Sequence, residues 1–216
     1  MSVNKEAYHR IQKFLSEKNV ALVAVSKSKP VEDILELYRL GHRDFGENYV
    51  QELLEKARQL PADIRWHFIG HLQTNKVRSI APFVQLIQSV DSLKLLKEIE
   101  KQGEKLGRTI PCLLQVQIAE EETKFGLDEP ELTAFIGQAG SLDRRFVKIE
   151  GLMGMASLTE DMEKVRNEFR QLKKLSDKYC DAQTLSMGMS ADYKIAIEEG
   201  STMVRIGSLL FGERVE

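Results

Sequence analysis

Two lysines follow directly on an apolar run near the start of the chain. Val20–Pro30 reads VALVAVSKSKP, so the run stops at Ser26 and is followed by Lys27 and Lys29. A lysine held near apolar walls loses some preference for its charged form, which lowers its pKa, and its neutral amine can form a Schiff base with a carbonyl group. The alternative is a rim lysine that extends to water. Side chains alternate along an extended chain, so periodicity does not choose between Lys27 and Lys29.

A second group of residues, near the end of the chain, suits a phosphate. Ser186–Ser190 reads SMGMS and leads into a short helix expected over Asp192–Glu199, while Gly207 and Ser208 follow the last apolar run. Glycine lets backbone N–H groups approach an anion, and a helix N-terminus adds partial positive charge. Ordinary glycine turns with a serine cap are the alternative. The occurrence of both stretches after the last two apolar runs favours a phosphate site.

Arg205, His67 and His71 are further candidates. Arg205 ends the last apolar run, and a buried arginine needs an anion or another acceptor, which is either a ligand or a strand-end carboxylate. His67 and His71 have the spacing of a helical zinc pair, but WHFIGHL reads as a strand and a turn. We therefore expect no metal site, and a structural hydrogen bond for His67. Cys112 has no obvious base beside it, which argues against a nucleophile.

Short apolar runs alternate with segments whose apolar residues recur with helical spacing. This alternation predicts parallel strands joined by helical crossovers. Eight runs favour a (β/α)8 barrel, preceded by an extra helix over Lys5–Glu17; an open doubly wound sheet is the alternative, but its GxGxxG turn is missing. In a barrel, functional residues lie where strands end. The predicted strands are Val20–Val25, His42–Phe45, Ile64–Ile69, Val84–Ser89, Ile110–Ile118, Phe146–Leu152, Thr184–Ser186 and Thr202–Ile206.

Composition describes an ordinary globular chain and excludes several functional classes. The 216 residues fit a single domain over 1–216, with 42% hydrophobic and 30% charged residues. A net charge of -2 argues against a general nucleic-acid or anionic-membrane surface. Two cysteines without ligand spacing suit a reducing compartment, and the sequence has no signal peptide and no apolar run long enough to span a membrane. We therefore expect a cytoplasmic protein with no nucleic-acid or membrane partner.

Five motifs carry a resemblance to a known family. AVSKSKP, FGENYVQE, WHFIGHLQTNK, GLMGMA and LSMGMSADYKIAIEEGSTMVRIGSLLFG resemble the pyridoxal phosphate homeostasis proteins, which are related to the barrel domain of alanine racemase. The resemblance implies a (β/α)8 barrel that holds pyridoxal 5'-phosphate. It implies a Schiff base on Lys27 and a pyridine nitrogen facing Arg205. The other implied contacts are Ser190, Gly207 and Ser208 at the phosphate, Asn48 and His67 at the ring, and Lys124 near the rim.

The resemblance also implies a function without turnover. The chain would take part in intracellular pyridoxal phosphate homeostasis, with no catalytic residues and with dependent apoenzymes as partners. Alanine racemase uses a tyrosine from a C-terminal β domain as second base; this chain ends at Glu216, so we expect no such domain and a monomer. Tyr49 and Tyr193 lie nearest the mouth, but neither is an obvious substitute. Two alternatives are a pyridoxal-dependent amino-acid racemase and a cofactor-free Schiff-base aldolase acting on a phosphorylated sugar.

Overall fold

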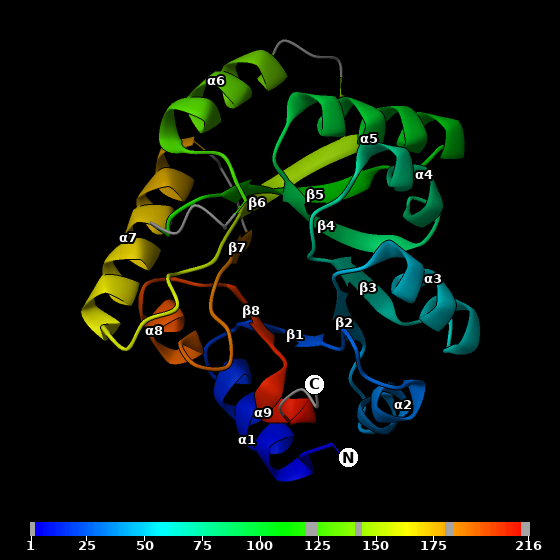
Figure 1. Ribbon diagram of the computed structural model, residues 1–216, viewed down its shortest axis with the longest axis vertical. Coiled ribbons are helices and arrows are strands. Elements are labelled where there is room, and N and C mark those ends of the chain that lie inside the picture. Colours follow the sequence, from blue (N-terminus) through cyan, green and yellow to red (C-terminus); the bar gives the residue numbers. More distant parts are fainter. Residues whose placement is uncertain (1–2, 120–124, 141–143, 180–183, 213–216) are drawn as a thin grey trace.

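The computed structural model describes residues 3–119, 125–140, 144–179 and 184–212, which form a closed parallel barrel with helices around it (Figure 1). Strands follow one another around the barrel in chain order, so the predicted (β/α)8 barrel is confirmed and the open sheet is wrong. The strands are β1 Ala21–Val25, β2 Asp44–Glu47, β3 Arg65–Phe68, β4 Val84–Val90, β5 Ile110–Val116, β6 Val147–Gly154, β7 Thr184–Ser186 and β8 Met203–Ile206. The helices are α1 Lys5–Ser16, α2 Val31–Arg39, α3 Val50–Gln59, η1 Thr74–Lys76, α4 Val77–Ile80, α5 Leu93–Leu106, α6 Glu129–Gly140, α7 Met162–Tyr179, α8 Tyr193–Glu198 and α9 Ser208–Phe211.

Every predicted strand overlaps an observed one, but the ends differ. The clearest displacement is at β2, which was expected over His42–Phe45 and runs over Asp44–Glu47. Glu47 is fully buried and its carboxylate accepts a hydrogen bond from Lys56 Nζ at 2.7 Å. Hydropathy treats a glutamate as a loop residue and does not reveal a partner that lies on the next helix.

The connection between β3 and β4 contains helical structure that the sequence did not predict. The 3-10 turn η1 continues directly into α4, and the two elements together span only Thr74–Ile80. A segment this short shows fewer than two helical turns of periodicity, so the apolar spacing gives no helix signal. Val77 and Ile80 are fully buried and pack the connection against the barrel.

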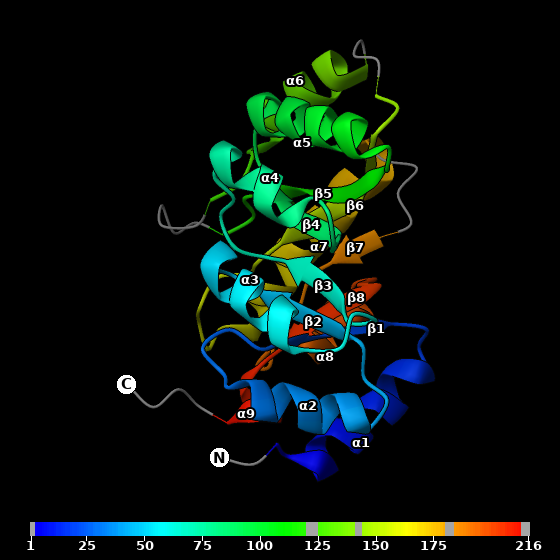
Figure 2. The same cartoon turned by 90° about the vertical axis from the view of Figure 1, so that its right-hand side faces the viewer.

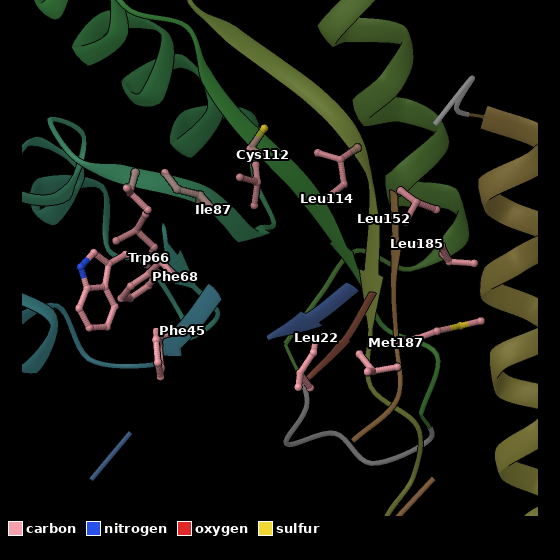
Figure 3. Packing of buried hydrophobic residues seen from close by; sticks show 14 of the residues in the cluster. Leu22, Phe45, Trp66, Phe68, Ile87, Cys112, Leu114, Leu152, Leu185 and Met187 are labelled. Atoms are coloured by element: carbon pink, nitrogen blue, oxygen red, sulfur yellow. The ribbon is translucent and has the colours of Figure 1, made fainter. Parts of the chain in front are cut away.

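The main core lies between the strands and the surrounding helices. Apolar side chains on the outer faces of the strands fill this layer (Figure 3); those labelled there are Leu22, Phe45, Trp66, Phe68, Ile87, Cys112, Leu114, Leu152, Leu185 and Met187. A separate small cluster of Leu86, Leu113 and Met153, joined by Met155 and Met203, packs apart from it. The residues that alternate with the outer-face side chains along the strands point to the barrel interior.

The extra N-terminal helix closes one side of the molecule. Figures 1 and 2 both show α1 near α2 and α9 at one end. Asn4 caps α1 by accepting a hydrogen bond from Ala7 N at 3.0 Å, and its own backbone N donates to Leu210 O at 2.8 Å. The first and last described helices are thereby joined directly. Among the described residues, no helix has both the length and the apolar character needed to cross a membrane.

Candidate functional site

Residues from four neighbouring strands meet at one mouth of the barrel. Because all strands are parallel, their carboxyl ends lie on the same side. Lys27 follows β1, Asn48 follows β2, Ser190 lies in the loop after β7, and Gly207 follows β8. The barrel therefore brings together the lysine and the glycine-serine stretches that lie at opposite ends of the sequence.

The loop after β1 separates the two candidate lysines. Lys29 Nζ donates hydrogen bonds to Phe211 O at 2.9 Å and to Gly212 O at 3.2 Å, so it is committed to the carboxyl end of α9. Lys27 is half-buried and lies directly after the buried Ser26 at the end of the strand. Ser28, between the two lysines, has a φ of 60°, which turns the chain sharply. This local geometry favours Lys27 as the lysine whose amine could react with a ligand at the mouth.

A buried charged cluster holds the start of this loop. Lys56 Nζ, on α3, lies 2.7 Å from Ser26 O, from Glu47 Oε1 and from Glu52 Oε1. The Ser26 hydroxyl donates to Glu47 Oε1 at 2.6 Å, and Ser28 N donates to Glu52 Oε1 at 2.6 Å. Burial raises the pKa of Glu47, although the charge of Lys56 opposes this. The cluster fixes the backbone on both sides of Lys27.

Arg205 projects from β8 into the barrel and is almost fully buried. One terminal nitrogen donates to Ser186 Oγ at 2.6 Å, and the other donates to the carbonyl oxygen of Gly154 at 2.9 Å. Among the described residues no carboxylate lies within salt-bridge distance of it; the acidic residues that follow β5 lie outside the described residues, so the alternative of an ion pair with a strand-end carboxylate stays a prediction. Burial lowers the pKa of Arg205 to about 10, which still leaves it charged at neutral pH.

The two glycine-serine stretches lie beside each other, as their strand positions predicted. Gly207 N donates to Ser190 Oγ at 3.3 Å, and Ser208 begins α9 with an exposed side chain. Gly188 has a φ of +97°, and a Cβ there would lie 2.6 Å from Ala196, so this turn requires glycine. Backbone N–H groups and hydroxyls thus collect at one place on the rim.

Asn48 and the turn after β3 define the opposite side of the mouth. The side-chain oxygen of Asn48 is buried and has no hydrogen-bond partner among the described residues. A Cβ on Gly70 would lie 2.1 Å from the carbonyl oxygen of Asn48, so the two strand ends touch through backbone atoms alone. An unpaired buried acceptor is costly, so Asn48 is a polar group whose partner needs an explanation.

His67 lies inside the barrel and not in a metal cluster. Its Nε2 is 3.0 Å from Asp44 Oδ1, and its Nδ1 is 3.1 Å from Gln88 Nε2, so the predicted structural hydrogen bond is present. His71 lies elsewhere, 3.4 Å from Asp91 and stacked on Phe125 with ring centroids 4.9 Å apart. The described residues contain no group of three or more histidine, cysteine or acidic side chains that could hold a metal ion.

The sequence reasoning missed Gln88 and Lys56, and it assigned Ser186 to the phosphate stretch and not to Arg205. Gln88 and Ser186 connect Arg205 to His67, and Lys56 anchors the loop that carries Lys27. Gln88 lies within the apolar run VQLIQSV, and a polar residue at that place was a signal that could have found it. Lys124, implied at the rim by the resemblance, lies outside the described residues.

Known proteins resemble this chain both in sequence and in structure. The family model for the alanine racemase N-terminal domain matches residues 5–215. Pyridoxal phosphate homeostasis proteins of Aquifex aeolicus and Homo sapiens are 43% and 40% identical, each over 89% of this chain and over 86% and 76% of their own lengths. The structure of PipY from Synechococcus elongatus, solved with PLP bound, superposes with a TM-score of 0.85 at 35% identity, over 95% of this chain and 100% of PipY.

A more distant structure shares the fold alone. Alanine racemase from Streptomyces lavendulae superposes with a TM-score of 0.75 at 18% identity, covering 94% of this chain but 56% of the racemase. The family model and the relatives together cover nearly the whole barrel and both glycine-serine stretches. The chain therefore belongs to the pyridoxal phosphate homeostasis protein family, within the alanine racemase N-terminal domain superfamily.

Proposed function

We propose that this chain binds pyridoxal 5'-phosphate at the barrel mouth and takes part in controlling its level, without catalytic turnover. The observation that carries the proposal is the convergence of a lysine, a buried arginine and a glycine-serine cradle at one mouth. The buried, unpartnered oxygen of Asn48 adds a polar position still to be filled. Relatives named for pyridoxal phosphate homeostasis, and PipY with PLP bound, support the same ligand.

The donor set of the mouth fits this cofactor. When bound, the cofactor supplies an aldehyde that forms a Schiff base with an amine and releases water, together with a phosphate and a pyridine ring. Lys27 is the proposed amine because it directly follows the buried end of β1, whereas Lys29 extends to the carboxyl end of α9. Ser190, Gly207 and Ser208 would hold the phosphate with hydroxyl and backbone donors. Asn48 and His67 are proposed toward the ring.

Arg205 supports binding without turnover only together with the question of a second base, because the resemblance implies the same arginine in alanine racemase, which is an enzyme. Its guanidinium can only donate hydrogen bonds, and with a pKa near 10 it keeps its proton at neutral pH. It would therefore donate to the pyridine nitrogen without transferring a proton. A pyridine that stays unprotonated is a weak electron sink, so chemistry at a bound amino acid gains little.

The racemase alternative needs a second base, and the tyrosines do not provide an evident one. Tyr193 is 9% exposed and its ring lies edge-on to Phe14, with centroids 6.2 Å apart. Tyr49 is 59% exposed and caps the start of α3. This arrangement favours the carrier over the enzyme. Dependent apoenzymes remain the proposed recipients.

A titration of purified protein with pyridoxal 5'-phosphate tests the proposal. We expect a saturable visible absorption band in the parent protein and in Lys29→Ala, and its loss in Lys27→Ala. With amino acids added, we expect racemisation no faster than that given by the same concentration of cofactor alone. A parent protein that gives no band would refute the binding site. Turnover that saturates with substrate and needs Lys27 would establish the racemase instead.

A further inference from the structure

A continuous chain of hydrogen bonds crosses the interior of the barrel. Arg205 Nη1 donates to Ser186 Oγ at 2.6 Å, and Ser186 Oγ donates to Gln88 Oε1 at 2.7 Å. Gln88 Nε2 is 3.1 Å from His67 Nδ1, and His67 Nε2 is 3.0 Å from Asp44 Oδ1. Five strands contribute one residue each, and all but Asp44 are at least nine-tenths buried.

The hydrogen bonds of this chain all run in one direction, because Arg205, at its start, can only donate. Arginine has no acceptor, so Ser186 must accept from it and point its own hydrogen at Gln88. Gln88 then presents its oxygen to Ser186, one amide hydrogen to His67 and the other to Met203 Sδ, which is 3.2 Å away. His67 Nδ1 must therefore lack a hydrogen, and Nε2 must carry the hydrogen that is donated to Asp44. One tautomer of His67 satisfies every bond, and all the donors point away from Arg205 toward Asp44.

The chain of hydrogen bonds lies between Arg205 and Asp44, the carboxylate with which the arginine would otherwise form an ion pair. Asp44 lies at the start of β2 and forms its ion pair with Arg65, whose Nε is 2.8 Å from Asp44 Oδ1. Hydrogen bonds and charge from Arg65 and His67 outweigh the effect of burial and hold the pKa of Asp44 well below its usual range. Arg205 is left with two neutral partners and keeps its guanidinium oriented by bonds rather than by a carboxylate.

We infer that Ser186 and Gln88 are positioning residues for Arg205, and that His67 completes the chain of hydrogen bonds that orients them. This inference rests on the proposed function, because Arg205 is the group that meets the ring. Hydrogen bonds that point in one direction polarise one another, so a break in the middle of the chain weakens the bond at its end. Arg205 held less firmly would bind the ring less well.

The protein contains a closely matched pair of serines for the test. Ser186 and Ser89 are both fully buried on strands, but the Ser89 hydroxyl has no hydrogen-bond partner among the described residues. Loading each variant with pyridoxal 5'-phosphate, we expect Ser186→Ala to release the cofactor about tenfold faster, as for loss of a bond to a charged group, and to shift the absorption band. Ser186→Thr restores the hydroxyl and should restore both values. Ser89→Ala should match the parent protein.

Identical behaviour of Ser186→Ala and Ser89→Ala would overturn the inference, because loss of the hydroxyl that bonds Arg205 would then matter no more than loss of a hydroxyl that has no partner among the described residues. Gln88→Met breaks the chain at another bond and replaces Ser186→Ala if that variant does not fold. It should also release the cofactor faster and shift the band. Normal release and an unshifted band in a folded Gln88→Met protein would equally refute the positioning role.

A second measurement uses the protein without cofactor and separates this inference from the proposed function. Nitrogen-15 NMR of the imidazole rings should show His67 with its hydrogen on Nε2 alone. Gln88→Glu replaces the amide donor beside Nδ1 with a carboxylate acceptor, so we expect a hydrogen on His67 Nδ1 in this variant, with His9, His42 and His71 unchanged. An Nδ1 hydrogen in the parent would refute the chain even if cofactor binds. A parent that shows the Nε2 tautomer but binds no cofactor would refute the proposed function alone.

Discussion

At the scale of single residues, the site depends on which partner each cation has. Lys29 is held by backbone carbonyls of the C-terminal segment, and Lys56 is held by two glutamates and the Ser26 carbonyl. Arg205 is held by a hydroxyl and a carbonyl. Three buried or half-buried cations near one mouth therefore have different environments, and these environments assign them different roles.

Arg205→Lys should weaken cofactor binding by about tenfold or more, since a lysine cannot reproduce a planar contact with two acceptors at once. Arg108 provides the control, because its two terminal nitrogens also bridge two carbonyls, those of Ala81 and Val84, away from the proposed site. Arg108→Lys should lower the free energy of unfolding and leave cofactor affinity unchanged. Equilibrium titration of both variants, with denaturant unfolding alongside, measures the difference. Equal affinity in the two variants would remove Arg205 from the site.

At the scale of elements, the ends of β2 and β3 approach so closely that side chains are excluded. Gly70 follows β3, and the atoms nearest its missing Cβ are the backbone atoms of Asn48 after β2. The contact fixes the position of Asn48 at the mouth. A backbone atom cannot move aside as the end of a flexible side chain can.

Gly70→Ala should therefore destabilise the fold by about 1–3 kcal/mol, as overpacking does, and should also weaken cofactor binding by displacing Asn48. Gly137 is the matched control. It lies within α6, where nothing stands within 4 Å of an added Cβ, so Gly137→Ala should be neutral or stabilising by about 0.5–1 kcal/mol. Urea unfolding of both variants provides the comparison. A Gly70→Ala protein as stable as Gly137→Ala would show that the strand ends can separate.

At the scale of the whole molecule, the barrel closes around polar residues as well as apolar ones. Asp44 connects solvent-exposed Arg65 to the internal chain. Because its pKa is lowered in the folded state, Asp44 contributes stability that is present above its ordinary pKa, near 4, and that is lost as the pH falls further. The closed barrel should therefore weaken in acid partly through this one carboxylate.

Asp44→Asn should lower the free energy of unfolding at pH 7 by about 1–3 kcal/mol, the value of hydrogen bonds to a charged group. Between pH 4 and pH 2 the variant should lose less stability than the parent, since its amide does not titrate. The hydrogen bond from Tyr38 and the ion pair with Arg43 also lower the pKa of Asp63, but its side chain is 57% exposed and screened by solvent, so Asp63→Asn should reduce the acid response much less than Asp44→Asn. Thermal unfolding across this pH range measures it. A parallel pH dependence in Asp44→Asn and the parent would exclude Asp44 as the source.

The sequence was sufficient for the architecture, because strand–helix alternation implies a parallel barrel and strand ends then share one mouth. From the predicted strand ends alone, this reasoning placed Lys27, Asn48, Ser190 and Gly207 on the same side of the barrel. It could not choose between Lys27 and Lys29, because the choice depends on the carbonyls of Phe211 and Gly212, distant in sequence. It also missed the internal chain, since no local pattern shows that residues from five strands point at one another. The short α4 was missed because it spans too few residues for periodicity.

We propose that Lys27 holds pyridoxal 5'-phosphate covalently. The most direct test is borohydride reduction of the loaded protein, followed by peptide mass mapping of the parent, Lys27→Ala and Lys29→Ala. The account predicts a pyridoxyl mass on the peptide position of Lys27 in the parent and in Lys29→Ala, and no specific label in Lys27→Ala. Label on Lys29 in the parent, or undiminished specific labelling in Lys27→Ala, would contradict it.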